Sequence, residues 1–179
     1  THLVCIDGPS GGGKSTLARR LARILEQSTR PTPVIHMDDL YEGWEGLGTV
    51  WSRLEAWVLA PLRSGRPACY RRYDWHREEY AEWHEVPAAS VLIVEGVGSA
   101  DRAIDGEATV KLWVDAPEEI RYARGMARDG DGYRPYWQLW ADQEEEHFAA
   151  ERTKERADLI VVGDPALPHD PETEIVVRR

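Results

Sequence analysis

The sequence predicts an α/β protein of three layers, in which a mainly parallel β-sheet lies between two layers of helices. Short apolar runs alternate with segments of helical periodicity along the 179 residues, which is typical of βαβ units. One apolar run, 91–94, is uninterrupted, as expected for a central strand that is covered on both faces. A third indication comes from the N-terminus, where an apolar run, a glycine-rich segment and a helical pattern follow one another within residues 3–27.

The individual elements are assigned from their periodicity. In the first helix, from Leu17 to Leu25, apolar residues recur three or four positions apart. The predicted helices are 15–27, 50–62, 117–127 and 136–156. The predicted strands are 3–6, 34–37, 91–94, 110–114 and 159–162, with 175–177 as a candidate edge strand. Residues 41–86 form an excursion between the second and third strands, in which 68–75 and 83–86 are candidates for a hairpin.

Composition and charge exclude several classes of protein. The formal net charge is −10, which argues against a nucleic acid or an anionic membrane surface as the main partner. The chain has 2 cysteines, no signal peptide and no apolar run long enough to cross a bilayer, so we expect a cytoplasmic protein. No linker and no internal repeat interrupts the chain, and we therefore expect one domain spanning 1–179.

The most specific motif is Gly8-Pro-Ser-Gly-Gly-Gly13-Lys14-Ser15, which fits the phosphate-binding pattern G-x-x-x-x-G-K-[ST] at every position. It lies between a predicted strand and a predicted helix, where backbone N–H groups and the positive end of the helix dipole converge on phosphate. The alternative is a glycine-rich turn that happens to precede a lysine. The motif predicts a site for a nucleoside triphosphate, whose phosphate-binding residues are Gly8, Ser10, Gly11, Gly12, Gly13, Lys14, Ser15 and Thr16. Lys14 is expected on the β- and γ-phosphates, the Ser15 hydroxyl on Mg²⁺, and Thr16 near the α-phosphate.

Carboxylates follow two of the predicted strands. Asp38 and Asp39 come after strand 34–37, and Glu95 ends strand 91–94. Ligands of open α/β sheets bind at the carboxyl ends of the strands. A carboxylate there accepts the proton of an attacking hydroxyl or holds a water on Mg²⁺, whereas the alternative for both aspartates is a turn or a helix cap.

Basic residues provide further candidates. Arg121, Arg124 and Arg128 recur along one side of a predicted helix, and Arg134 follows a break rich in glycine and aspartate. Arginine suits the charge that develops on a transferring phosphoryl group, although a solvated helix face is the alternative, and Arg121 fits that alternative best. The acidic run 142–146 is most simply a solvated face as well.

In order along the chain, these motifs resemble the uridine kinase branch of the P-loop nucleoside and nucleotide kinases. The segments that carry the resemblance are Gly8–Ser15, Met37–Tyr41, Tyr73–His76, Val94–Gly96, Lys111–Asp115, Arg124–Asp129 and Arg156–Val161. The resemblance implies a P-loop kinase fold with a five-stranded, mainly parallel sheet and a short lid at about 128–136. It implies ATP and Mg²⁺ as cofactors and a small alcohol, most simply a nucleoside such as uridine or cytidine, as the acceptor.

The resemblance also implies roles for individual residues. Asp38 would activate the acceptor hydroxyl, and Asp38 and Glu95 would lie near the metal together with Ser15. Arg124 and Arg128 would act on the phosphates, Arg124 also on adenine, and residues 163–167 would pass the adenine edge. The acceptor would be contacted by Asp38, Tyr41, Tyr73, His76, Glu95 and Arg134.

The chain departs from the uridine kinase pattern after Tyr41. Uridine kinases carry a longer acceptor-binding segment with an Asp-His-Pro stretch, where this chain has Glu42-Gly-Trp-Glu-Gly-Leu-Gly48. Another nucleoside, a nucleotide or an unrelated alcohol therefore remains an alternative acceptor. A nucleotide-dependent switch and a silent nucleotide-binding module are alternatives of another class, and a homo-oligomer is compatible with the sequence.

Overall fold

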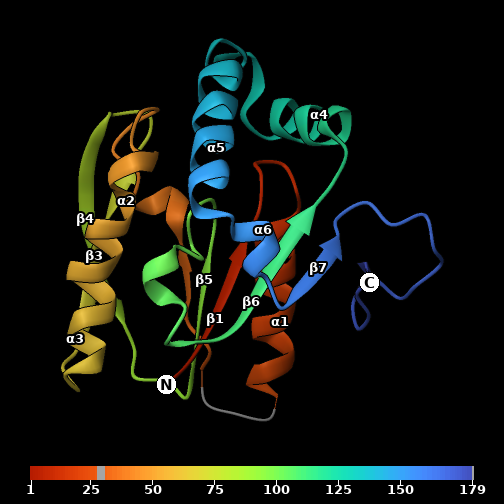
Figure 1. The fold of residues 1–179 in the computed structure, drawn as a ribbon. Coiled ribbons are helices and arrows are strands. Elements are labelled where there is room, and N and C mark those ends of the chain that lie inside the picture. Colours follow the sequence, from red (N-terminus) through yellow and green to blue (C-terminus); the bar gives the residue numbers. More distant parts are fainter. Residues whose placement is uncertain (28–30, 179) are drawn as a thin grey trace.

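A six-stranded sheet forms the centre of the molecule in the computed structural model, which describes residues 1–27 and 31–178 (Figure 1). The strand order is β2-β5-β1-β6-β7-β8. The strands are β1 (His2–Asp7), β2 (Val34–His36), β5 (Val91–Glu95), β6 (Ala108–Asp115), β7 (Leu159–Val162) and β8 (Val177–Arg178). The first five in this order are parallel, and β8 pairs antiparallel with β7.

Helices cover both faces of this sheet. They are α1 (Lys14–Glu26), α2 (Leu47–Leu54), α3 (Ala60–Arg63), α4 (Glu118–Asp129), α5 (Trp137–Glu151) and α6 (Thr153–Arg156), and a π-helical turn, Glu55–Leu59, joins α2 to α3. None of the helices within the described residues is both long and apolar enough to span a bilayer.

The side chains of β1 alternate between two apolar clusters, one on each face of the sheet. Leu3 and Cys5 belong to the cluster that α2 and Trp140 of α5 complete, whereas Val4 and Ile6 pack with α1. This period of two in a strand buried on both sides is the physical basis of the three layers. The α/β/α fold expected from the sequence is therefore confirmed.

The excursion 41–86 contains α2, α3 and a separate two-stranded sheet, β3 (Ala68–Asp74) with β4 (Glu79–Val86). The antiparallel pairing of Tyr70 with His84 confirms the hairpin predicted for this part of the chain. Figure 1 shows the hairpin together with α2 and α3 on one side of the molecule, and the C-terminal chain on the other.

Two elements differ from the sequence prediction. The helix predicted for 136–156 is divided at Arg152, whose left-handed φ of 52° ends α5 before α6 begins. The sheet has β8 in addition to the five parallel strands, and this strand lies at Val177–Arg178 instead of 175–177. The expected lid, 128–136, consists of the end of α4 and two short 3₁₀ turns, Gly130–Gly132 and Arg134–Tyr136.

Candidate active site

The glycine-rich loop between β1 and α1 lies at the carboxyl ends of the parallel strands. Gly8, Gly11 and Gly13 all have positive φ values. A Cβ on Gly8 would lie 2.3 Å from the carbonyl oxygen of Val114, and one on Gly11 would lie 2.3 Å from that of Arg121. No other residue type fits these positions without displacing backbone, which explains why the loop is built from glycine.

Asp7, the last residue of β1, anchors this loop through hydrogen bonds to backbone N–H groups. Its side chain is fully buried and accepts three backbone N–H groups, from Gly8 at 2.7 Å, Gly98 at 3.1 Å and Ala100 at 3.0 Å. Burial raises the pKa of Asp7, although these hydrogen bonds act in the opposite direction. The carboxylate thereby joins the loop after β1 to the loop after β5. Sequence reasoning missed Asp7, and the available signal was an acidic residue at the end of a strand otherwise apolar from residue 3.

The tip of the loop is held by α5. Oε1 of Glu144 accepts a hydrogen bond from the backbone N–H of Ser10 at 2.8 Å and another from Nε1 of Trp140 at 2.8 Å. Nη1 of Arg121 donates to the carbonyl oxygen of Ser10 at 3.3 Å and lies 3.9 Å from Glu144. Glu144 is only 4% exposed, so the prediction of a solvated acidic face was wrong for this residue. The side chain of Arg121 is only 16% exposed, so the prediction that it is simply exposed was wrong as well.

A cavity of about 370 Å³ opens above the loop. It brings together most of the residues predicted to bind phosphate, metal or the acceptor hydroxyl. Those that line it are Ser10, Gly11, Gly13, Lys14, Ser15, Thr16, Asp38, Glu95, Arg124 and Arg128, together with Arg19 and Gly125. Lys14 is 8% exposed, and its Nζ donates to the carbonyl oxygen of Pro9 at 3.0 Å. Carboxylates and cations thus line one space, where Asp38 and Glu95 share the cavity with the lysine and arginine side chains.

Asp38 lies in a 3₁₀ turn, Met37–Asp39, directly after β2. Its side chain reaches the open cavity, but the protein that surrounds the cavity limits its solvation. This desolvation, followed by the negative charge of Glu95, raises the pKa of Asp38. Glu95 is 3% exposed and lies 2.5 Å from Nδ1 of His36, a hydrogen bond that raises the pKa of the imidazole. The site thus holds two carboxylates in different environments, one open and one buried.

The oxygen atoms of this cavity suit Mg²⁺. The Ser15 hydroxyl is exposed, and the carboxylates of Asp38 and Glu95 line the same space. Mg²⁺ in nucleotide sites is held by one or two protein oxygens together with substrate phosphates, and no cage of protein ligands is needed. Consistent with this, the described residues contain no group of three or more His, Cys, Asp or Glu side chains that would hold a metal ion.

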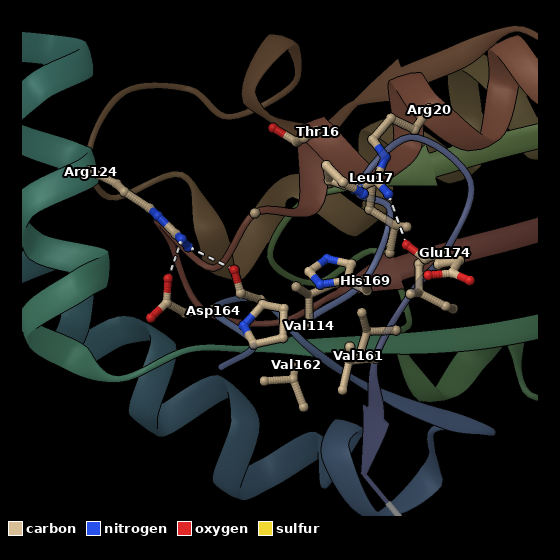
Figure 2. Close-up of a pocket in the computed structure, with 16 residues that line it drawn as sticks. Thr16, Leu17, Arg20, Val114, Arg124, Val161, Val162, Asp164, His169 and Glu174 are labelled. Carbon is tan, nitrogen blue, oxygen red and sulfur yellow. Dashed lines mark hydrogen bonds and ion pairs between the residues drawn. The ribbon is translucent and has the colours of Figure 1, made fainter. Parts of the chain in front are cut away.

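A second cavity, of about 350 Å³, adjoins the first and shares Gly13, Thr16 and Arg124 with it (Figure 2). Arg124 reaches across the boundary and donates to the carbonyl oxygen of Gly163 at 3.1 Å and to Asp164 at 3.0 Å. The chain after β7 passes so close to the phosphate loop that a Cβ on Gly163 would lie 2.1 Å from the carbonyl oxygen of Gly12. The two cavities therefore lie side by side along the loop, with Gly13, Thr16 and Arg124 at their boundary.

Aromatic residues surround the acceptor side of Asp38. Nε1 of Trp75 donates to the backbone carbonyl of Asp38 at 3.0 Å. Trp44 packs on Trp75, with ring centroids 4.7 Å apart, and stacks on Tyr136 at 4.5 Å with an angle of 5° between the planes. Tyr136 belongs to the expected lid, so these rings connect the lid to the excursion. No spacing in the sequence indicates the contact between Trp44 and Tyr136, which lie far apart in the chain.

The other predicted acceptor contacts lie away from the cavity above the loop. Tyr41 is 1% exposed, and its hydroxyl donates to the carbonyl oxygen of Val97 at 2.7 Å, so its side chain is part of the packed core. Tyr73 is 6% exposed and packs edge-on against Trp75. His76 is exposed in the β3–β4 turn, where its backbone N–H donates to Asp74, and Arg134 is exposed in the second turn of the lid region. This placement gives no support to a contact of these four side chains with the acceptor.

Comparison with known proteins agrees with this geometry. A family model described as an AAA domain (AAA_18) matches residues 4–152. A possible uridine kinase from Bacillus stearothermophilus has a similar structure, with a TM-score of 0.63 and 21% identity over 89% of this chain and 87% of that chain. A shikimate kinase from Acinetobacter baumannii, in complex with shikimate, has a TM-score of 0.50 and 14% identity over 96% of this chain and 86% of that chain. At these identities the likeness concerns the fold. A search of curated proteins finds no significant match.

Proposed function

Because the chain belongs to the AAA_18 family of AAA domains and has the fold of P-loop kinases, we propose that it is a kinase. It transfers the γ-phosphoryl group of ATP to a hydroxyl group of a small molecule. The observation that carries the proposal is the arrangement around one cavity, where a phosphate loop with Lys14 and Ser15 faces Asp38. A nucleotide-binding loop alone serves many functions. A carboxylate across the cavity, with a raised pKa, is what acceptor activation requires.

In this mechanism the protein contributes position and charge. The oxygen of the acceptor hydroxyl forms a bond to the γ-phosphorus, the bond to the β–γ bridging oxygen breaks, and Asp38 accepts the hydroxyl proton. Lys14, Arg124 and Arg128 stabilise the negative charge on the phosphoryl oxygens. Ser15 and Glu95 would hold Mg²⁺, which neutralises charge on the β- and γ-phosphates when it is bound.

Arg128, at the start of the expected lid, lines the cavity together with Arg124 and Gly125 of α4. Arg128 pairs with Asp129, which raises its pKa, as does the nearby charge of Asp38. Closure of residues 128–136 over the phosphates would exclude water and so favour transfer to the acceptor over hydrolysis. We propose that residues 1–179 form a single kinase domain.

A nucleoside is the first acceptor to test. Trp75 contacts Asp38, Trp44 packs on Trp75, and Tyr133 and Tyr136 stack on Trp44. Aromatic side chains provide surfaces on which a base can stack. The carboxylates of Asp38 and Glu95 disfavour an acceptor that carries negative charge close to its hydroxyl. The short segment 42–48 leaves the base specificity open to experiment.

The test combines an acceptor panel with one variant. ADP release from MgATP is measured with uridine, cytidine, other nucleosides, nucleotides, sugars and no acceptor. We expect release that depends on one acceptor, and we expect Asp38→Asn to lower kcat by roughly 10²–10⁴-fold because the proton acceptor is removed, while ATP affinity stays near normal. ADP release that is slow and independent of every acceptor would favour a nucleotide switch, and binding without any release would favour a silent module.

A further inference from the structure

His36 lies beside the candidate active site, although the function proposed for this site gives it no role. It is the last residue of β2 and comes two positions before Asp38. The nearest segment that carries the uridine kinase resemblance begins one residue later, at Met37, so the resemblance assigns nothing to His36. Its side chain is 45% exposed, and the packing of the core therefore does not require an imidazole at this position.

The register of the sheet brings His36 to Glu95. β2 and β5 are parallel, and His36 is the partner of Glu95 in their pairing. Because successive side chains of a strand alternate between the two faces, paired residues on neighbouring strands project from the same face. Nδ1 of His36 lies 2.5 Å from Oε1 of Glu95. An ionised carboxylate only accepts hydrogen bonds, so Nδ1 carries the hydrogen and is the donor.

The carboxylate of Glu95 lies where a fixed orientation has an effect on binding. Glu95 is 3% exposed, and it lines the cavity above the loop together with Ser15 and Asp38. The negative charges of Glu95 and Asp38 repel each other. The hydrogen bond from His36 engages Oε1 of Glu95 and leaves Oε2 for a ligand. A metal ligand that a neighbouring hydrogen bond already orients binds its ion more tightly than one that is free to rotate.

We propose that His36 is a positioning residue, whose hydrogen bond holds the carboxylate of Glu95 in the orientation that binds the metal ion of MgATP. The inference rests on the proposed function, because it takes Glu95 to hold Mg²⁺ at the nucleotide. It adds a residue that contacts neither the nucleotide nor the metal and that acts only through Glu95. Loss of His36 should therefore weaken binding of the metal complex and spare binding of the nucleotide alone.

The experiment measures, by calorimetry, the affinity for MgATP and for ATP in the presence of EDTA. We expect the wild type to bind MgATP more tightly than metal-free ATP. Removal of a hydrogen bond to a metal ligand lowers metal affinity by roughly 10–100-fold. His36→Ala should accordingly bind MgATP about tenfold more weakly than the wild type does. Its affinity for metal-free ATP should be unchanged, which also shows that the variant is folded.

His84→Ala is the matched control. Nε2 of His84 lies 3.1 Å from Oε1 of Glu82 in the β3–β4 hairpin, and both side chains are exposed. This variant removes a pair of the same chemistry that does not line the cavity, and it should change neither affinity.

Two further variants separate positioning from other roles of the imidazole. The amide nitrogen of asparagine is bonded to Cγ, as Nδ1 of histidine is, so His36→Asn keeps a donor near the same place. It should recover most of the MgATP affinity that His36→Ala loses. In the double variant of His36→Ala with Glu95→Gln, MgATP affinity should equal that of Glu95→Gln alone, because His36 acts only through Glu95.

Several results would overturn the inference and leave the kinase proposal in place. They are unchanged MgATP affinity in His36→Ala, equal weakening of MgATP and metal-free ATP in this variant, no recovery in His36→Asn, and additive losses in the double variant. A wild type that binds ATP equally well with and without Mg²⁺ would overturn the inference as well. Failure of the wild type to bind either form of ATP would instead refute the proposed function itself.

Discussion

Glu144 offers the most direct test of how tertiary structure shapes the phosphate loop. Its carboxylate is 4% exposed and binds the N–H of Ser10 and Nε1 of Trp140, each at 2.8 Å. Glu144→Ala removes both hydrogen bonds. Trp140 keeps a partner, because Nε1 also lies 2.8 Å from Oγ of Ser10, but the N–H of Ser10 loses its acceptor.

The magnitude follows from these contacts. A hydrogen bond to a charged group contributes about 1.5–3 kcal/mol, and an unsatisfied buried N–H costs a similar amount. Alanine avoids the desolvation of a buried carboxylate, which offsets part of the loss. We expect a net loss of about 2 kcal/mol in the free energy of unfolding, which lowers Tm by roughly 4–8 °C for a chain of this size. If half of that energy orders the loop tip, MgATP affinity falls about fivefold.

The measurement is urea unfolding together with calorimetric titration of MgATP. Glu145→Ala is the matched control, because Glu145 is the next residue of α5 and is exposed to solvent. This variant should change both quantities very little. If Glu144→Ala behaved like Glu145→Ala in both measurements, the argument that α5 holds the loop tip would be refuted.

Two further predictions concern the backbone and pH. Gly163→Ala should weaken MgATP binding and destabilise the fold by roughly 1–3 kcal/mol, because its Cβ would lie 2.1 Å from the carbonyl oxygen of Gly12. Calorimetry measures the binding and urea unfolding measures the stability. The control is Gly106→Ala, whose Cβ would meet nothing within 4 Å, and an equal loss in this variant would contradict the reasoning. Burial raises the pKa of Asp7 above its usual 3.8, so the folded chain holds this proton more tightly than the unfolded chain, and the free energy of unfolding should fall as pH rises from about 4 through the raised pKa. Asp7→Asn should lack this part of the pH dependence in urea unfolding followed from about pH 4 to about pH 8, and identical slopes in the two proteins would contradict it.

Much of the fold could be predicted from sequence because its signals are local. Each parallel strand is an apolar run bounded by turn residues, and α1 is marked by a period that places Leu17 and Ala18 in the core. The break at Arg152 escaped prediction, because a non-glycine residue in a left-handed conformation leaves no compositional mark. The order of strands along the sheet, β2-β5-β1-β6-β7-β8, likewise depends on packing between distant segments.

The candidate site divides in the same way. The phosphate loop was selected from its motif, Asp38 and Glu95 from strand ends and Arg124 from its spacing on a predicted helix, and the structure brings them to one cavity. Their roles in binding and catalysis remain predictions. Tyr41 was selected by resemblance, but burial decides its side-chain contacts, and a residue fully enclosed by the core gives the same sequence signal as one that faces a ligand.

The sequence by itself determined the backbone of the phosphate loop, since glycines with positive φ and a following helix are encoded within eight consecutive residues. Only the tertiary structure decided what holds and surrounds that loop. Glu144 meets Ser10 across 134 residues of chain, and Glu174 meets Arg20 of α1 across 154. Such contacts arise from the packing of layers, and no spacing in the sequence records them.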